Sequence, residues 1–339
     1  MLLLFSSIFW LQSFVTAEAE PKCFKDFDPE KYNQNRILGG SDCYPGQWPF
    51  AVQIMIGGVV HAGYNKLGDH DITLLKGNCT GSIVHPLYIL TAAHCLFQRG
   101  DFSMKVRPNS DFKVIVGSIK YGKDGIIHEV EDILVHAGYN KLGDHDITLL
   151  KLKTPIIFND LAKSICITKK FPITFKKVFA IGFGTKATQE SDETSKSSEN
   201  SLKPVFEKDT KENYKIGVNG GIYTKENYKI GVNGGVCKFV DIPLHKDEHC
   251  LNLPKNSSIY FVPGLEICGG GLWKGTLEGD SGGPLIGQFQ DGYYQIGLTA
   301  RGQPIPESRG NPVDFGVYTK ISKYCDWISQ QTKNEVVCA

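Results

Sequence analysis

The sequence predicts an all-β fold with a single helix at the end of the chain. Short apolar or alternating runs recur throughout and are separated by turns rich in glycine and proline, which is the pattern of antiparallel sheets and barrels. The stretch Ser322–Thr332 instead has the apolar spacing of an amphipathic helix. With 339 residues, the chain is long enough for one large domain or two small ones.

The strands are expected where apolar runs lie between turn residues. They are predicted at residues 50–56, 105–116, 126–135, 147–152, 178–184, 237–244, 261–267, 284–288, 293–299 and 316–321. Between the fifth and sixth of these, Thr185–Gly235 is rich in Ser, Glu and Lys and is predicted to be a long polar loop.

Charge and cysteine content point to an oxidising compartment outside the cytosol. The net charge of +1 gives no support for nucleic acid or an anionic membrane as partner. Residues 1–17 are mostly apolar and end in the small residues of a cleavage site, so we expect a secretory signal peptide. Ten cysteines behind such a signal indicate disulfides, and hence a secreted, extracellular protein.

Two stretches of the chain occur twice without change. Val60–Lys76 is identical to Val135–Lys151, and Thr210–Gly221 recurs as Thr224–Gly235. Neither has the period or copy number of a repeat architecture. Functional repeats normally diverge, so identical copies indicate either a recent duplication or an error in the assembled gene sequence, and the sequence leaves both open.

A glycine-rich loop near the C-terminus carries the first candidate for chemistry. In Gly279–Leu285, three glycines and a proline surround Asp280 and Ser281. Such a loop is a tight turn whose backbone N–H groups can face one point without obstruction. A serine becomes a nucleophile when a base removes its proton and N–H groups hold the resulting oxyanion. The loop therefore requires a histidine and an acid elsewhere in the chain.

Two further motifs supply them. His94 lies in Thr-Ala-Ala-His-Cys after an apolar run, and Asp146 lies in Asp-Ile-Thr-Leu-Leu at the start of a strand. With Gly-Asp-Ser-Gly-Gly-Pro around Ser281, the order His, Asp, Ser resembles that of the trypsin/chymotrypsin family of serine peptidases. The resemblance runs from Ile37 to the C-terminus, apart from inserted stretches. Because of the duplication, Asp71 is a second copy of the acid, and we assign the role to Asp146.

The resemblance implies two six-stranded antiparallel β-barrels with the catalytic cleft between them, in a peptidase domain at residues 37–339. It implies that Ser281 attacks a peptide carbonyl, that His94 acts as general base and then acid, and that Asp146 orients the imidazole. The N–H groups of Gly279 and Ser281 would form the oxyanion hole. We expect no metal and no cofactor.

The resemblance also implies a zymogen. Residues 18–36 would be a pro-segment, and cleavage after Arg36 would free the ammonium of Ile37. That ammonium would pair with Asp280 and order the oxyanion loop, since a buried carboxylate needs a counter-charge. Expected partners are protein or peptide substrates, an activating protease and a protein inhibitor.

Spacing alone does not fix the cysteine connectivity. The resemblance implies the pairs Cys79–Cys95, Cys250–Cys268, Cys43–Cys237 and Cys23–Cys166, and it leaves Cys325 and Cys338 to pair with each other. Two bridges of the family are absent: Val178 and Gly287 replace one pair, and Leu277 stands in the other. Of two glycosylation sequons, at Asn78 and Asn256, we favour Asn256, because the first includes a disulfide cysteine.

The specificity pocket departs from that of trypsins. Its base position, six residues before the nucleophile, is Gly275 rather than an acid, so nothing there pairs with a desolvated Arg or Lys side chain. With walls at Gly302 and Gly316 the pocket would be open, which favours a large apolar residue at P1. Glu278 would lie at the rim, and Arg301 stands where the family has a tryptophan.

The altered pocket leaves a second interpretation open, a protease-like binding protein without activity. Such proteins typically lose a member of the triad, whereas this chain has all three residues. We therefore favour the secreted serine endopeptidase.

Overall fold

The structure is a computed structural model. It describes residues 23–29, 40–64, 70–97, 104–140, 142–171, 174–184, 205–208, 214–217, 236–252, 260–272, 274–289, 292–306 and 312–339. The predicted signal peptide, the cleavage site at Arg36 and Ile37, and the sequon asparagine Asn256 lie outside these ranges.

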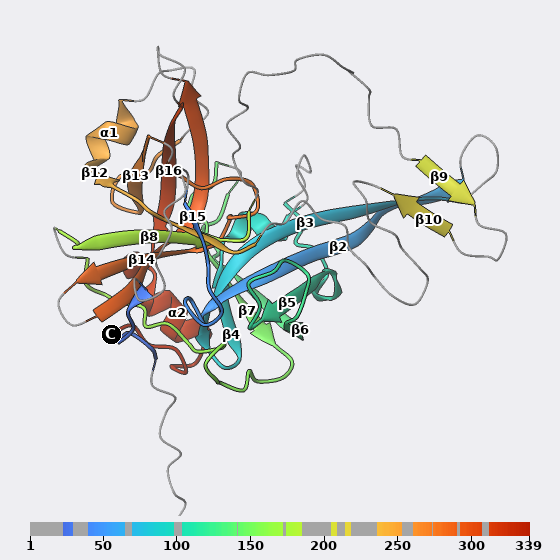
Figure 1. The fold of residues 1–339 in the computed structure, drawn as a ribbon, viewed down its shortest axis with the longest axis horizontal. Coiled ribbons are helices and arrows are strands. Elements are labelled where there is room, and N and C mark those ends of the chain that lie inside the picture. The colour runs from blue at the N-terminus through green and yellow to red at the C-terminus, as the bar shows by residue number, and fades with distance from the viewer. Residues whose placement is uncertain are drawn as a thin grey trace, which may run out of the picture.

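The first half of the chain forms a closed antiparallel barrel of six strands (Figure 1). Its strands follow one another around the barrel in the order β2, β3, β4, β7, β6, β5. They are β2 (Ala51–Tyr64), β3 (His70–His85), β4 (Tyr88–Thr91), β5 (Phe112–Val116), β6 (Ile126–Val135) and β7 (Thr148–Leu152).

The second half forms an eight-stranded antiparallel sheet in the order β1, β11, β8, β14, β15, β16, β13, β12. The long strands are β8 (Lys177–Gly182), β11 (Lys238–Asp241), β13 (Glu266–Leu272), β14 (Pro284–Phe289), β15 (Gly292–Pro306) and β16 (Pro312–Lys320). The two outermost strands, β1 (Ser41–Asp42) and β12 (Leu244–His245), are two residues long. The predicted all-β fold is confirmed, with a closed six-stranded barrel in the first half. The second half is a half-barrel sheet of eight strands, two of them short edge strands, where a second closed barrel of six strands was expected.

The helices of the described residues are few and short. They are α1 (Asp247–Leu251), α2 (Cys325–Gln331) and the 3-10 turns Ala93–Leu96, Asn109–Asp111 and Ile321–Lys323. Helix α2 lies within the predicted amphipathic segment, and its apolar residue Ile328 is fully buried.

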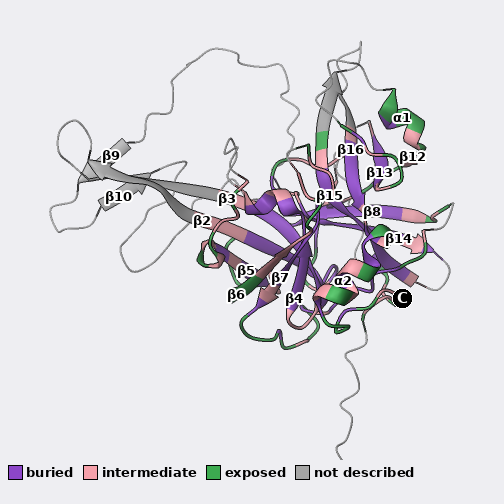
Figure 2. Ribbon diagram, turned by 180° about the vertical axis from the view of Figure 1, so that it is seen from behind, coloured by how far each residue is buried: buried purple, intermediate pink, exposed green. Residues whose placement is uncertain are grey.

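The core is continuous between the two halves. One cluster of buried side chains includes Ile54 and Leu149 from the barrel together with Ile181 and Leu298 from the second sheet. Buried residues accordingly run through both halves where they meet (Figure 2). Burial of this kind is the main source of stability, and here it also fixes the two halves against each other.

The predicted pro-segment contributes to this packing. Cys23 is bonded to Cys166, and the N–H of Phe24 donates to the Ser164 carbonyl at 2.6 Å. The ring of Phe27 packs against Trp48 and Phe50, at 5.7 Å between ring centroids in both cases. Residues 23–29 are thereby attached to the body of the fold by a covalent bond and by apolar contact.

The duplicated stretch adopts two different structures. In Val135–Lys151 it forms a loop followed by β7, whereas the described residues of the first copy, 60–64 and 70–76, extend β2 and β3 into a long arm that leaves the barrel (Figure 1). The arm is paired from Ala51–Ser82 to Tyr64–His70. The prediction of a strand ending at residue 56 is therefore too short, because the inserted residues continue the hairpin ladder.

Three other predicted elements need correction. The strand predicted at 105–116 is formed only at Phe112–Val116, after a 3-10 turn. The strand predicted at 261–267 begins only at Glu266 and continues to Leu272. Within the stretch predicted as one long polar loop, β9 (Val205–Lys208) and β10 (Tyr214–Gly217) pair as a small antiparallel hairpin.

Candidate active site

His94 lies on the 3-10 turn Ala93–Leu96, directly after strand β4. Its neighbours Ala93 and Cys95 are buried, and Cys95 is bonded to Cys79 on β3. The imidazole keeps 33% of its side-chain surface exposed. The turn is therefore fixed on its inner side by packing and a disulfide, while the ring remains accessible to a ligand.

Asp146 is almost fully buried, with 3% of its side chain exposed, and it holds His94 at two points. One carboxylate oxygen accepts the backbone N–H of His94 at 2.8 Å, and the other lies 2.7 Å from His94 Nδ1. The Asp146 carbonyl accepts the Thr319 hydroxyl of β16 at 2.9 Å. Contacts from both halves of the fold thus set the position of this acid and, through it, the orientation of the imidazole.

Ser281 lies in the turn between β13 and β14, against the first barrel. Its carbonyl accepts the N–H of Thr80 at 2.8 Å and lies 3.8 Å from Cys95 Sγ. The loop therefore meets the segment that carries His94. Gly279 and Gly282 have φ values of +97° and +75°, which residues with a Cβ rarely adopt. At Gly282 a Cβ would also collide with Thr91, so both the backbone conformation and the lack of space require glycine there.

The N–H groups of the same loop fall into two sets. Gly282 donates to the Thr299 carbonyl at 2.7 Å and Gly283 to the Asp280 carbonyl at 2.8 Å. Within the described residues, the N–H groups of Gly279 and Ser281 donate to no backbone carbonyl. These two N–H groups lie on either side of Asp280 in the chain.

The Asp280 side chain turns inward from the loop. Its two oxygens accept the N–H groups of Gly184 and Leu277, each at 2.8 Å. Loss of solvation outweighs these bonds and raises the pKa of the carboxyl to about 6. A Cβ on Gly182 would lie on one of the carboxylate oxygens, and one on Gly184 would come within 2.6 Å of it.

Sequence comparison agrees with this arrangement. The family model for trypsin matches residues 37–238 and, in a second match, residues 227–328. The first match contains His94 and Asp146, and the second contains Ser281.

The chain belongs to the trypsin family.

The acid that contacts His94 is Asp146. Asp71 lies on the arm, where its Cα pairs with that of Gly63. The sequence around the two acids is identical, so only the position of each copy in the chain separates them. The first copy continues a hairpin. The second leads into β7, the barrel strand that pairs with β4, and β4 leads into the turn that carries His94.

The residues expected to line the trypsin-family pocket are partly brought together. Gly302 of β15 pairs with Gly316 of β16, and a Cβ on Gly302 would lie 3.5 Å from the carbonyl oxygen of Thr276, next to Gly275. The Tyr318 hydroxyl lies 2.7 Å from where a Cβ on Gly316 would be. Glu278 is exposed. Arg301 is the exception, because its guanidinium donates to Glu266 and to the carbonyls of Tyr260 and Gly143.

Five disulfides are formed within the described residues. They are Cys23–Cys166, Cys43–Cys237, Cys79–Cys95, Cys250–Cys268 and Cys325–Cys338. The four pairs implied by the family resemblance are therefore present, and the remaining two cysteines, Cys325 and Cys338, are also bonded to each other.

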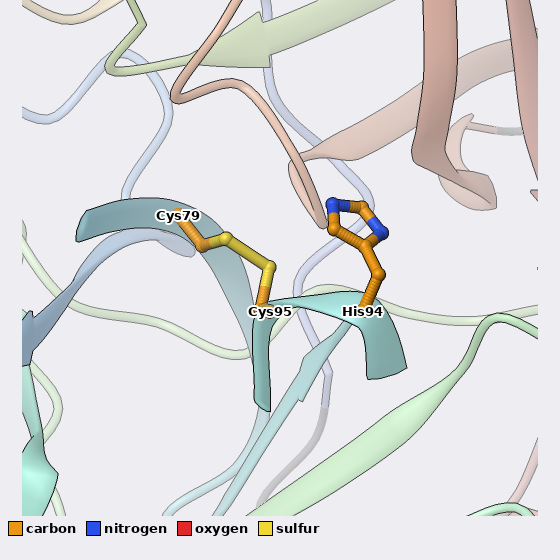
Figure 3. Close-up of side chains that lie close together, drawn as sticks. All are labelled: Cys79, His94 and Cys95. Carbon is orange, nitrogen blue, oxygen red and sulfur yellow. A yellow bond between two sulfur atoms is a disulfide. The ribbon is translucent and has the colours of Figure 1, made fainter. Parts of the chain in front are cut away.

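One disulfide lies beside the candidate site and resembles a metal-binding group. Cys79, Cys95 and His94 place their ligand atoms within 4.8 Å of one another (Figure 3). Both sulfurs are joined in the disulfide, so neither is a thiolate that could bind a metal. The group therefore serves to fix the turn of His94.

The place of one absent family disulfide is filled by an aromatic ring. Val178 and Gly287 are opposite each other in the ladder between β8 and β14, as bridge partners would be. A Cβ on Gly287 would lie 2.6 Å from the ring of Phe175, which also packs edge-on against Phe289. Apolar packing thus joins the strands where the family has a covalent bond.

Sequence reasoning missed the residues that support the site from a distance. Thr80 connects the two halves, because its hydroxyl donates to the Gly279 carbonyl at 2.9 Å and accepts the Phe183 N–H at 3.1 Å. Thr319 supports Asp146, and Glu266 binds Arg301. A lone threonine or glutamate in a strand carries no signal of such a role, so only the fold could reveal it.

Proposed function

We propose that this trypsin-family protein is a secreted serine endopeptidase. The observation that carries the proposal is the contact of the buried Asp146 with both the ring and the backbone of His94, next to the glycine-rich loop of Ser281. A carboxylate at Nδ1 keeps the proton on that nitrogen, which leaves Nε2 free to accept a proton from a nucleophile.

In this proposal Ser281 Oγ attacks the peptide carbonyl while His94 removes its proton. The negative charge of Asp146 stabilises the imidazolium that forms. The N–H groups of Gly279 and Ser281 hold the oxyanion. Neither N–H group donates to a backbone carbonyl among the described residues. This supports the role, because an oxyanion can accept only from donors that the fold itself does not already engage. The protonated His94 then donates to the leaving amine.

The edge of β15 is suited to a peptide substrate. β14 pairs with β15 as far as Leu298, and the contact continues to Thr299 through Gly282 and Gly283. From Ala300 onward, the described partner of β15 is β16 on its other edge. A substrate strand can add to the open edge by backbone hydrogen bonds, which places its scissile bond near Ser281.

The side chain at P1 would enter the space beside Gly275, Gly302 and Gly316. Gly275 occupies the position at its base where trypsins have an acid, so we infer a preference for a large apolar residue over Arg or Lys. The Tyr318 hydroxyl near Gly316 adds one polar group, which is compatible with an aromatic P1 side chain.

Activation would follow cleavage after Arg36 by another protease. In the uncut chain, loss of solvation raises the pKa of the Asp280 carboxyl to about 6. A positive charge beside it would therefore stabilise its ionised form. The new ammonium of Ile37 would supply that charge and stabilise the loop that carries Ser281. The bond between Cys23 and Cys166 would retain the pro-segment after the cut.

Secretion is supported by the five disulfides and the predicted signal peptide. None of the helices among the described residues is long and apolar enough to cross a membrane.

The test is peptide hydrolysis by the purified protein after cleavage between Arg36 and Ile37, on a library that varies at P1. Activity on apolar P1 residues, absent from Ser281→Ala, is expected. If the cut and folded wild type hydrolyses no peptide, the proposal is wrong and the protease-like binding protein takes its place. Activity restricted to Arg and Lys would overturn the assigned pocket alone.

A further inference from the structure

Arg301 makes an unusually complete set of contacts beside the candidate active site. Its Nη2 donates to the two oxygens of Glu266 at 2.7 and 2.8 Å, and its Nε donates to the Tyr260 carbonyl at 2.6 Å. Its Nη1 lies 3.5 Å from the Gly143 carbonyl. The guanidinium of one β15 residue therefore connects β13, the segment before it and the loop before β7.

The loop that Arg301 reaches is the one that carries Asp146. Gly143 precedes this acid by three residues, in a compact turn closed by a hydrogen bond from its N–H to the Asn140 carbonyl at 3.0 Å. Gly143 has a φ of +88°, and a Cβ there would lie 3.3 Å from Arg301 Nη1. Glycine thus permits both the turn and the close approach of the guanidinium.

The ion pair between Arg301 and Glu266 is largely buried. The side chains of Arg301 and Glu266 are 21% and 4% exposed. Burial raises the pKa of Glu266, and the charge of Arg301 opposes that rise. Removal of the arginine would leave a carboxylate without a counter-charge in the interior, whereas joint replacement of both partners by apolar residues need not destabilise the fold.

Arg301 and Asp146 both act on a third side chain, Tyr139. The charges of both groups act on the Tyr139 hydroxyl, where Asp146 raises the pKa and Arg301 lowers it. A change at Arg301 is therefore expected to reach the acid of the proposed triad through the loop at Gly143.

We propose that Arg301 is a positioning residue that clamps the Asp146 loop to the second sheet and so holds Asp146 against His94. Its donors are taken up by Glu266, Tyr260 and Gly143, so it is not a receptor for an acidic substrate side chain. This inference rests on the proposed peptidase function for its kinetic consequences, although the clamp itself can be measured without activity.

The test separates the clamp from the ion pair. Arg301→Met leaves Glu266 unpaired and should destabilise the fold. Arg301→Met with Glu266→Gln removes both charges and keeps an acceptor for the Val262 N–H, which Glu266 accepts at 2.7 Å. This double variant should recover the midpoint of urea unfolding, but it cannot restore the contacts to the Tyr260 and Gly143 carbonyls. Arg301→Lys keeps the charge without the planar fork, so it should behave like the double variant in kinetics.

For the double variant we expect kcat to fall about 100-fold with KM within about twofold, because displacement of catalytic groups by about 1 Å has consequences of that size. The acidic limb of the kcat–pH profile should also shift. A double variant with wild-type stability, kcat and pH profile would show that Arg301 is only structural and would overturn the proposal.

Hydrogen exchange of the uncut protein provides the readout that does not depend on activity. Amides of residues 142–147 should exchange faster in the double variant, with β4 and β7 core amides unchanged; unchanged exchange in the loop would refute the clamp. Lys113→Met with Glu129→Met removes an exposed ion pair as a matched control and should alter neither readout. If wild type is inactive, the peptidase proposal fails, and exchange alone decides the clamp.

Discussion

Substitution of Asp146 by asparagine should abolish most of the activity while the fold is retained. Asp146 uses both oxygens, one for the His94 N–H at 2.8 Å and one for Nδ1 at 2.7 Å. An asparagine of the same shape has one acceptor and one donor, so it can satisfy only one of the two positions.

Both orientations of the amide are damaging. If the oxygen faces the backbone N–H, the NH2 group faces Nδ1 and stabilises the tautomer with its proton on Nε2, which can no longer accept from Ser281. If the oxygen faces Nδ1, the buried N–H of His94 meets a second donor, which costs about 1–3 kcal/mol of stability. The first orientation is therefore favoured, and kcat should fall about 10⁴-fold, as this substitution does in a serine peptidase triad.

The assay is kcat on the best peptide substrate, with urea unfolding alongside to show that stability changes by no more than about 3 kcal/mol. The matched control is Asp71→Asn, which makes the same change in an identical stretch of sequence. It should leave kcat unaltered. Loss of activity in Asp71→Asn with retention in Asp146→Asn would refute the assignment of the acid.

Three more predictions concern the surroundings of the site. Because the pKa of Asp280 is raised to about 6 in the uncut fold, the folded state binds this proton more tightly than the unfolded chain. The free energy of unfolding should therefore fall as pH rises from about 4 to about 6, by at most about 3 kcal/mol, and Asp280→Asn should remove that fall in urea titrations. Gly182→Ala puts a methyl group on the Asp280 carboxylate and should cost about 1–3 kcal/mol and block labelling by an active-site probe, whereas Gly57→Ala, with nothing within 4 Å, should do neither. Glycan analysis by mass spectrometry should find occupancy at Asn256 and none at Asn78, whose amide nitrogen is buried against the oxyanion loop; a glycan at Asn78 would contradict this packing.

The sequence predicted the candidate site well where a function requires particular residues next to one another in the chain. The segments around His94, Asp146 and Ser281 come together in the fold. The motif of Ser281 includes the glycines that its turn needs, and the motif of His94 includes the cysteine that bonds its turn to β3. Strands such as Ile126–Val135 are where their apolar runs predicted them. Local patterns suffice in these cases because the backbone conformation and the side-chain role are set by neighbours in the chain.

The sequence failed where a contact joins distant segments. Arg301 was expected at the pocket, but the partners that capture its guanidinium come from β13 and from the Asp146 loop. The inserted copy at Val60–Lys76 shows the same limit, because an identical sequence forms an arm at one place and a loop with β7 at the other. Tertiary context overrides local preference in both.

The most direct test of the central claim is labelling by a fluorophosphonate probe before and after cleavage at Arg36. This reagent reacts with a serine only when its base and oxyanion donors are assembled. We expect labelling of the cleaved wild type, much less of the uncut chain, and none of Ser281→Ala. Absence of labelling in a folded protein cut before Ile37 would contradict it.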